Sequence, residues 1–422
     1  MMIIRRFHKE PPFSLYNLIF RARTYMKILI YRYGSIFEPD VIEAFSGLGI
    51  NCEEIKEEIT NKDIKQSERI DLVSKAVLSN IDAGTPYLFV FSINFYPDIS
   101  ALCEKLRIKY VCWSVDCPVL ELFSKEIKNS YNRIFLFDRH QYQWVSKYNP
   151  EGAFHLPLAS GVGRIDKVIE GITSEDKVRF SSDITFVGSL YSEKNIYNEL
   201  KDMNSFAKGY LDGIIEAQLG VYGANIMESA LTDEVVAEAG KYMAKYNSEG
   251  LVEPIERFLL ANRYMGYELA YRERVRTLNA LGQHFNVDLY TLSDTSPLKG
   301  VNNKGQAKTL SQMPKIFRLS KINLNMTMRP IETGLPLRIF DILSSGGFCM
   351  TNFQEELLDM FTIGEDIEAY SSLDELIDKC RYYLANEDVR AEVARKGYEK
   401  VKNIHNIQNS VVNIIQNLQD SN

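Results

Sequence analysis

The sequence predicts an α/β protein with two Rossmann-like domains, and three observations lead to this fold class. Short apolar segments of strand length alternate with helical segments over most of the chain, which is typical of parallel sheets covered on both faces. The length of 422 residues suggests about two or three domains. A glycine-containing break at 161–163, followed by a polar stretch to Ser182, separates two series of such segments.

The first series defines an N-terminal domain, which we assign to residues 1–165. Helices are expected up to Leu48 and at 65–82 and 98–107, and strands at 26–32, 50–59, 86–93, 109–115, 133–138 and 153–157. An extra basic and aromatic segment, residues 14–25, precedes the first strand. It is expected either to pack on its own domain as a helix or to contact a membrane surface peripherally.

The second series defines a C-terminal domain, which we assign to residues 166–403. Strands are expected at 183–187, 286–292, 322–326 and 348–351, and helices at 336–345, 373–385 and 388–402. Helical periodicity fills residues 192–283, and no proline lies between Pro157 and Pro254. Because proline interrupts helices, its absence permits long helices in this region. The pattern therefore predicts a helical insertion, with a last helix in 404–422 packing back on the N-terminal domain.

The composition excludes several classes of protein. Apolar residues make up 45%, charged residues 25%, and the net charge is −7, which does not fit a disordered chain or a dedicated nucleic-acid binder. No apolar run has the length of a membrane span. The six cysteines form no Cys-x-x-Cys pair and the five histidines show no metal-ligand spacing. We therefore expect reduced thiols, no metal site and a cytoplasmic location.

The clearest chemical signal is the segment that follows the strand at 322–326. Gly334 and Pro336 open a helix whose free backbone N–H groups suit a phosphate. Arg338 lies in its first turn, where a guanidinium can bind a diphosphate in a bidentate manner. Asp341 shares a face with Arg338 and is placed to accept hydrogen bonds from ribose hydroxyls. The alternative is an ordinary helix with a surface ion pair.

A family resemblance distinguishes these alternatives. Gly334-Leu-Pro-Leu-Arg338-Ile-Phe-Asp341, followed by Leu-Ser-Ser-Gly346, resembles the acidic donor-binding motif of glycosyltransferases with two facing Rossmann-like domains, the GT-B fold. More narrowly, it resembles the CgeB-like spore maturation group of glycosyl transferase group 1 type, whose pattern is roughly Gly-x-Pro-x-Arg-x-Phe-Glu. Asp341 replaces that Glu. The broader retaining families carry two Glu eight residues apart, whereas Glu332 stands nine residues before Asp341.

Further stretches resemble the same group. The segment 186–191 resembles the glycine-containing loop that opens the donor domain, and 320–325 resembles the strand before the acidic motif. The Trp-x-x-Asp-x-Pro element at 113–118 and the last strand of the N-terminal domain at 155–159 are also similar. The resemblance implies that the donor is bound by Gly188, Ser189, Tyr290, Asn325, Glu332, Thr333, Gly334, Arg338 and Asp341.

Two polar residues beyond strands of the N-terminal domain are the catalytic candidates. Asp116 can act as the general base that deprotonates an acceptor hydroxyl, or it caps a helix starting at Pro118. His140 follows the next strand and is the reserve candidate, together with Asp138. For Tyr290 the sequence leaves two alternatives, stacking on a nucleobase and packing in the core.

The resemblance thus implies a bacterial-type glycosyltransferase, a hexosyl- or related transferase. It would move a sugar from a nucleotide-diphosphate sugar, such as a UDP-sugar, to a hydroxyl of a glycan, protein or small molecule. No metal, no cofactor and no nucleic acid is expected. The insertion at 192–283 is expected to shape the acceptor site, recognise a protein acceptor or form a homodimer. The alternatives are a non-catalytic sugar-nucleotide-binding or structural protein and a sugar-nucleotide epimerase.

Overall fold

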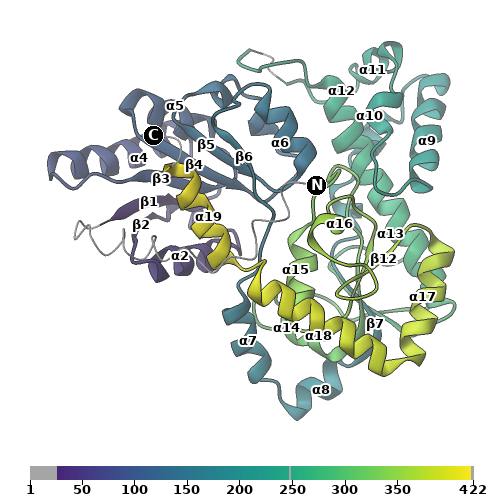
Figure 1. Ribbon diagram of the computed structural model, residues 1–422. Helices are drawn as coiled ribbons and strands as arrows, with labels where there is room; N and C mark the ends of the chain where they lie inside the picture. The colour runs from purple at the N-terminus through teal and green to yellow at the C-terminus, as the bar shows by residue number, and fades with distance from the viewer. Residues whose placement is uncertain (1–25, 247–248, 420–422) are drawn as a thin grey trace.

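A computed structural model describes residues 26–246 and 249–419. In this part of the chain the strands form two parallel sheets of six strands each (Figure 1), which confirms the predicted α/β class. The segment 14–25, predicted to pack on its domain or to contact a membrane, lies outside the described residues.

The N-terminal sheet has the strand order β2-β1-β3-β4-β5-β6. Its strands are β1 (Lys27–Tyr31), β2 (Asn51–Ile55), β3 (Phe89–Ile93), β4 (Lys109–Ser114), β5 (Asn132–Leu136) and β6 (Ala153–His155). Alternate residues of β1 enter different apolar clusters, Ile28 and Ile30 on one face and Leu29 and Tyr31 on the other. Both faces are therefore covered, which explains why the strands read as continuous apolar runs.

Helices cover the two faces of this sheet. They are α2 (Glu38–Gly47), α3 (Glu57–Thr60), α4 (Gln66–Asp82), α5 (Pro97–Leu106) and α6 (Arg139–Ser146). Two short 3-10 helices, Leu120–Phe123 and Lys125–Lys128, follow β4. The sheet's carboxyl edge therefore ends in loops and helix starts, the positions where parallel sheets bind ligands.

The C-terminal sheet has the order β12-β11-β10-β7-β8-β9. Its strands are β7 (Ser182–Val187), β8 (Val287–Tyr290), β9 (Val301–Asn303), β10 (Ser320–Asn325), β11 (Cys349–Asn352) and β12 (Glu368–Tyr370). Its helices include α14 (Met313–Leu319), α15 (Leu337–Ser344), α16 (Leu357–Met360), α17 (Leu373–Ala385) and α18 (Glu387–Asn403). The elements β9, β12 and α14 were not predicted, because three to seven residues are too few for a clear period.

The polar stretch between the two sheets is helical rather than irregular. It contains α7 (Val162–Glu170) and α8 (Ser174–Phe180). Val162 and Ile165 of α7 are buried, and Thr173 forms a capping box with Asp176 at the start of α8. No helix was predicted in this stretch, because short helices that depend on a capping box and a few apolar contacts leave no clear period in a polar sequence.

The insertion contains shorter helices than its proline-free sequence permits. They are α9 (Ser205–Leu219), α10 (Met227–Ala230), α11 (Asp233–Ala239) and α12 (Glu256–Leu259), followed by a π-helical turn at Leu260–Met265 and by α13 (Gly266–Gly282). They share an apolar cluster that also includes Phe123 of the N-terminal domain. Hydrogen bonds Lys125 N to Gly250 O (2.7 Å) and Val252 N to Phe123 O (2.8 Å) join the insertion to that domain.

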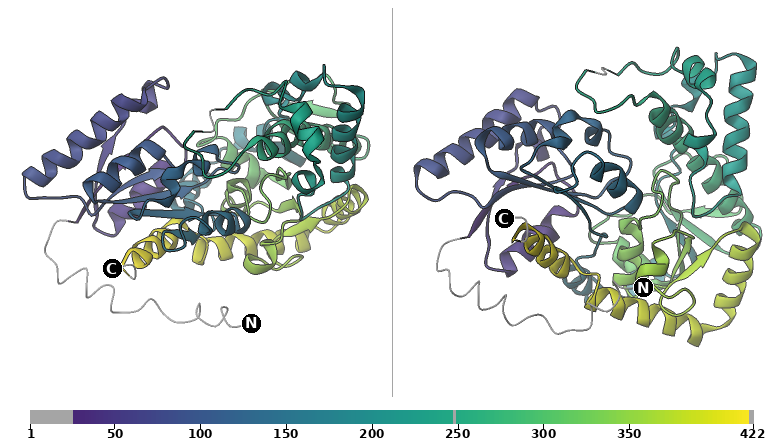
Figure 2. Two further views of the ribbon diagram at one scale, coloured as in Figure 1. Left: turned by 90° about the horizontal axis from the view of Figure 1, so that it is seen from above. Right: turned by 45° about the horizontal axis from the view of Figure 1, so that its top comes forward.

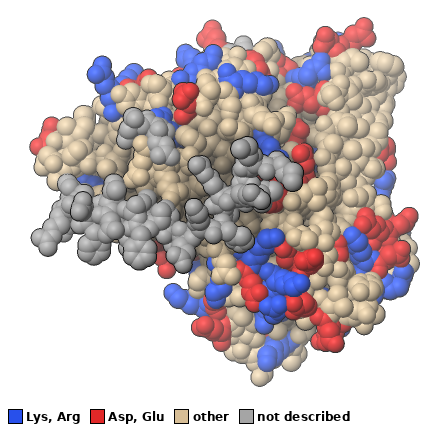
Figure 3. Space-filling view, in the orientation of Figure 1, with Lys and Arg blue, Asp and Glu red and all other residues tan. Residues whose placement is uncertain are grey.

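The end of the chain returns to the N-terminal domain. The last helix, α19 (Ile407–Gln419), packs on α2 (Figures 1 and 2), and Lys109 Nζ donates to the carbonyl of Leu418 (3.0 Å). The domain boundaries drawn from the sequence stay a prediction. All six cysteines are free. Among the described residues no helix has the length and apolar character to cross a bilayer. On the face drawn in Figure 3, acidic and basic side chains are interspersed over the lower helices.

Candidate functional site

Asp138, which follows β5, joins the two domains at the loop before α15. Its Oδ2 accepts hydrogen bonds from Thr333 N (2.9 Å) and Gly334 N (3.0 Å), and its Oδ1 accepts from Gln141 N (2.8 Å). A Cβ on Gly334 would lie 2.8 Å from the Asp138 Cα. Glycine at 334 is therefore required by the close approach of the domains.

Glu356, just before α16, makes a second connection between the domains. Its Oε1 accepts from the backbone N–H of Arg139 (2.8 Å) and from the Thr333 hydroxyl (2.8 Å), and its Oε2 lies 2.9 Å from His155 Nε2. The Glu356 side chain is only 1% exposed. We call Asp138, Glu356, Thr333 and Gly334 the domain junction.

The domain junction corrects three predictions. Thr333 and Gly334 were expected to hold the donor, but their N–H groups are used by Asp138. Asp138 was a reserve base, but it is 1% exposed and accepts from three backbone N–H groups, so it positions the loop instead.

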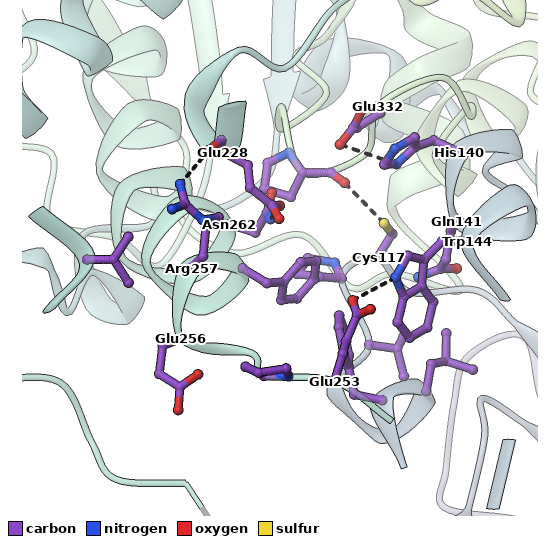
Figure 4. Close-up of a pocket in the computed structure, with 18 of the residues that line it drawn as sticks. Cys117, His140, Gln141, Trp144, Glu228, Glu253, Glu256, Arg257, Asn262 and Glu332 are labelled. Carbon is purple, nitrogen blue, oxygen red and sulfur yellow. Dashed lines mark hydrogen bonds and ion pairs between the residues drawn. The ribbon is translucent and has the colours of Figure 1, made fainter. Parts of the chain in front are cut away.

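His140 and Glu332 lie beside the junction and face each other. His140 Nδ1 is 3.3 Å from Glu332 Oε1, with the two side chains 55% and 25% exposed (Figure 4). Burial, with the nearby carboxylates of Asp138 and Glu228, raises the pKa of Glu332 to about 8. A perturbed acid in contact with an exposed imidazole is the arrangement expected at a catalytic site.

This pair lies at one end of a cavity of about 660 Å³. Figure 4 shows the cavity between the N-terminal domain, the insertion and the loop that carries Glu332. Cys117 Sγ donates to the Pro330 carbonyl (3.1 Å) and Trp144 Nε1 to Glu253 (2.9 Å), so contacts between different parts of the chain hold the walls together. A cavity of this size accommodates a small molecule.

Arg338 and Asp341 form a second polar group on α15. Arg338 Nη1 lies 3.4 Å from Asp341 Oδ2, and the side chains are 28% and 19% exposed. Burial lowers the pKa of Arg338 and raises the pKa of Asp341. The positive charge of Arg164 acts in the opposite direction on the pKa of Asp341. Pro336 is the N-cap rather than the first helical residue, so the helix starts at Leu337.

Arg274 of α13 lies near this group. Its guanidinium donates to the carbonyls of Ser189 and Met326, and it stacks 4.3 Å from the centre of the Tyr191 ring. Its positive charge contributes to the lowered pKa of Arg338. We call Ser189, Arg274, Arg338 and Asp341 the arginine cluster. Sequence reasoning missed Arg274, because nothing local marks it within a long helical region.

Two further predicted donor residues, Tyr290 and Asn325, are buried. Tyr290 is 6% exposed and packs near Phe180, which selects the core alternative. Asn325 is buried and donates to the hydroxyls of Thr327 and Thr351, both at 2.9 Å. Their side chains are thus not available to a ligand in this structure.

Gly188 directly follows β7, and Asp116 lies two residues after the end of β4. A Cβ on Gly188 would lie 3.1 Å from the Phe186 ring. The exposed Asp116 accepts a hydrogen bond from Asn94 Nδ2 (2.6 Å). No helix starts at Pro118, so the capping alternative for Asp116 was wrong. Asp116 remains a candidate base.

Comparison with known families identifies the C-terminal part of the chain. A family model described as glycosyl transferase-like matches residues 268–416, a range that includes Arg274, Arg338 and Asp341. A comparison with curated proteins finds no match.

Comparison with solved structures identifies the fold. A glycosyltransferase from Rickettsia africae ESF-5 and the sucrose-phosphate synthase from Thermosynechococcus elongatus each match with a TM-score of 0.50 and 10% identity, over 94% of this chain and 98% of theirs. Anabaena Alr3699/HepE in complex with UDP and glucose matches with a TM-score of 0.50 and 9% identity, over 94% of this chain and 100% of its own. The chain therefore has the GT-B fold, and its residues 268–416 match the glycosyl transferase-like family model.

Proposed function

We propose that the protein transfers a sugar from a nucleotide-diphosphate sugar to an acceptor hydroxyl. The observation that carries this proposal is the arginine cluster. It places the positive charge of Arg274 on α13 near the Arg338–Asp341 pair on α15, and all three residues lie in the range that the glycosyl transferase-like family model matches. Two positive charges suit a diphosphate, and a carboxylate suits ribose hydroxyls.

The arginine cluster would stabilise the leaving diphosphate. Charge develops on its oxygens as the bond to the sugar breaks, and preorganised cations lower the energy of that state without a metal. Because HepE was solved with UDP and glucose, a UDP-sugar is the first donor to test. We propose transfer of this kind as the specific activity of the protein. We also propose that the chain belongs to the CgeB-like group, that it transfers a hexose, and that it works in the cytoplasm of a bacterial cell.

His140 is the base that we assign to the transfer. Its Nδ1–H would donate to a Glu332 oxygen, which leaves Nε2 to take the proton of the acceptor hydroxyl. The hydroxyl oxygen forms a bond to the anomeric carbon, and the bond from that carbon to the diphosphate oxygen breaks. Asp116, exposed at the end of β4, is the second candidate for the proton acceptor.

A turnover assay on the full chain tests the proposal. Donor sugars with uracil, guanine, adenine, cytosine and thymine bases are each incubated with and without a panel of hydroxyl acceptors. Transfer predicts nucleoside diphosphate release that depends on an acceptor and that Arg338→Ala abolishes. Isomerised donor without acceptor would instead show an epimerase, and binding without turnover a non-catalytic protein.

A further inference from the structure

The cavity beside His140 is distinct in chemistry from the arginine cluster. Three parts of the chain build it: the loop after β4 with α6, the insertion around α10 to α12, and the loop before α15. The donor proposal does not use most of these residues. The insertion supplies about half of the wall, so it must shape whatever binds there.

Apolar side chains form most of the cavity wall. They come from both the N-terminal domain and the insertion: Val119, Leu122, Phe123, Trp144, Val236 and Phe258. Phe123 is in ring contact with both Trp144 (4.4 Å between centroids) and Phe258 (4.6 Å). A wall of this kind binds an apolar or aromatic body rather than a fully hydrated one.

The charged residues of the wall are predominantly acidic. Its acidic residues are Asp138, Glu228, Asp233, Glu253, Glu256 and Glu332, of which Glu332, with a pKa raised to about 8, is largely uncharged at neutral pH. Arg257 is the one lysine or arginine among the lining residues, and it is paired with Asp233 (2.5 Å). An anionic ligand would therefore meet the negative charges of the ionised members of this set and no free cation among the lining residues, which costs affinity in a partly buried space.

We propose that this cavity binds the acceptor. The acceptor is an uncharged or cationic molecule with an apolar or aromatic body, and its hydroxyl lies at His140. A sugar carrying a phosphate or carboxylate is excluded. This inference rests on the proposed function, and it assigns the insertion the role of shaping the acceptor site.

The fluorescence of Trp144 provides a direct test. The chain has two tryptophans, and the other, Trp113, is fully buried in the N-terminal core. Phenyl β-glucoside and phenyl β-glucoside 6-phosphate, which differ only in the phosphate, are titrated into the full-length protein. The uncharged probe is expected to change the emission and saturate, and the phosphate to bind about tenfold more weakly or not at all. Trp144→Phe removes the signal.

Two matched variants locate the binding. Ala237 is exposed on α11 and lines the cavity, whereas Ala217 is exposed on α9 away from it. Ala237→Phe fills the cavity and is expected to weaken phenyl β-glucoside binding about tenfold, while Ala217→Phe leaves it unchanged. Both variants are expected to bind UDP as the wild type does, measured by calorimetry.

The proposal is overturned if the phosphorylated probe binds as tightly as the uncharged one, if neither binds, or if Ala237→Phe binds like the wild type. The calorimetric UDP titration separates this failure from that of the proposed function. Loss of UDP binding with intact glucoside binding removes the donor assignment and leaves the cavity assignment standing.

Discussion

The arginine cluster and the cavity lie at the same domain boundary but have opposite charge. The cluster brings Arg274 and Arg338 together near one carboxylate, whereas the cavity carries six carboxyl groups and one paired arginine. One region suits the diphosphate of a donor and the other repels it. The difference teaches that the two substrates can be sorted by charge before any specific contact forms.

Removing the imidazole of His140, which lines the cavity, is expected to have the largest effect on turnover. His140→Gln keeps a polar side chain without a base, and loss of general-base catalysis lowers kcat by about 10²–10⁴-fold. The KM of the donor should change little, because the donor is held by the arginine cluster rather than by His140. Steady-state kinetics check this, with the exposed His284→Gln as control. Unchanged kcat would transfer the base role to Asp116.

Removing one charge from the arginine cluster is expected to be nearly as severe. Arg338→Ala should lower kcat/KM for the nucleotide sugar by about 10²–10³-fold, because one preorganised donor to the developing charge is lost. The matched control is Arg395→Ala, an exposed arginine on α18. Normal turnover by Arg338→Ala would remove the cluster from the mechanism.

The carboxylate of the cluster is expected to contribute less. Asp341→Asn should lower kcat/KM by about 10–100-fold, as expected for a hydrogen bond to a charged group. Asp341→Glu restores the residue of the family pattern and should retain most activity. Equal losses in both variants would indicate a packing role instead of a ribose contact.

Substitution in the domain junction is expected to lower the free energy of unfolding. Asp138→Asn presents an amide to backbone N–H donors, and we expect a loss of about 2 kcal/mol in the free energy of unfolding. Chemical denaturation followed by fluorescence measures it, with the exposed Asp378→Asn as control. Full stability combined with lost turnover would show that Asp138 is catalytic after all.

The smallest expected effect is a change in how the melting temperature depends on pH. The pKa of Glu332 is raised to about 8, so its protonated form stabilises the fold below its ordinary pKa and this contribution is lost as pH rises through about 8. Glu332→Gln cannot ionise. The melting temperature of the wild type should therefore fall relative to that of Glu332→Gln between about pH 4.5 and pH 8, and the difference should level off above pH 8. Parallel curves for the two proteins would refute the raised pKa.

The sequence predicted the sheets better than it predicted the site. Strands such as β1 and β5 are apolar on both faces, and this pattern is local and strong. The donor segment 332–341 was predicted as one unit, but its first residues join the domains and only Arg338 and Asp341 enter the arginine cluster. The partner that uses those N–H groups, Asp138, is 195 residues away in the chain.

Apart from the predicted site residues, such as His140 and Glu332, the lining residues of the cavity had no signal in the sequence. Leu122, Trp144 and Glu253 come from three separate parts of the chain, and each is unremarkable in its own segment. Arg274 is likewise an ordinary arginine of a long helix until α13 packs beside the loop after β7. Long-range packing, rather than local pattern, decides which side chains share a site.

Calorimetric titration of the full-length protein with UDP, GDP, ADP, CDP and dTDP tests the central claim most directly. The account predicts that at least one nucleoside diphosphate binds the wild type, and that Arg338→Ala weakens this binding by about 10-fold or more through the lost charge-assisted contact. Binding of that nucleotide with equal affinity to both proteins, or of none to the wild type, would contradict it.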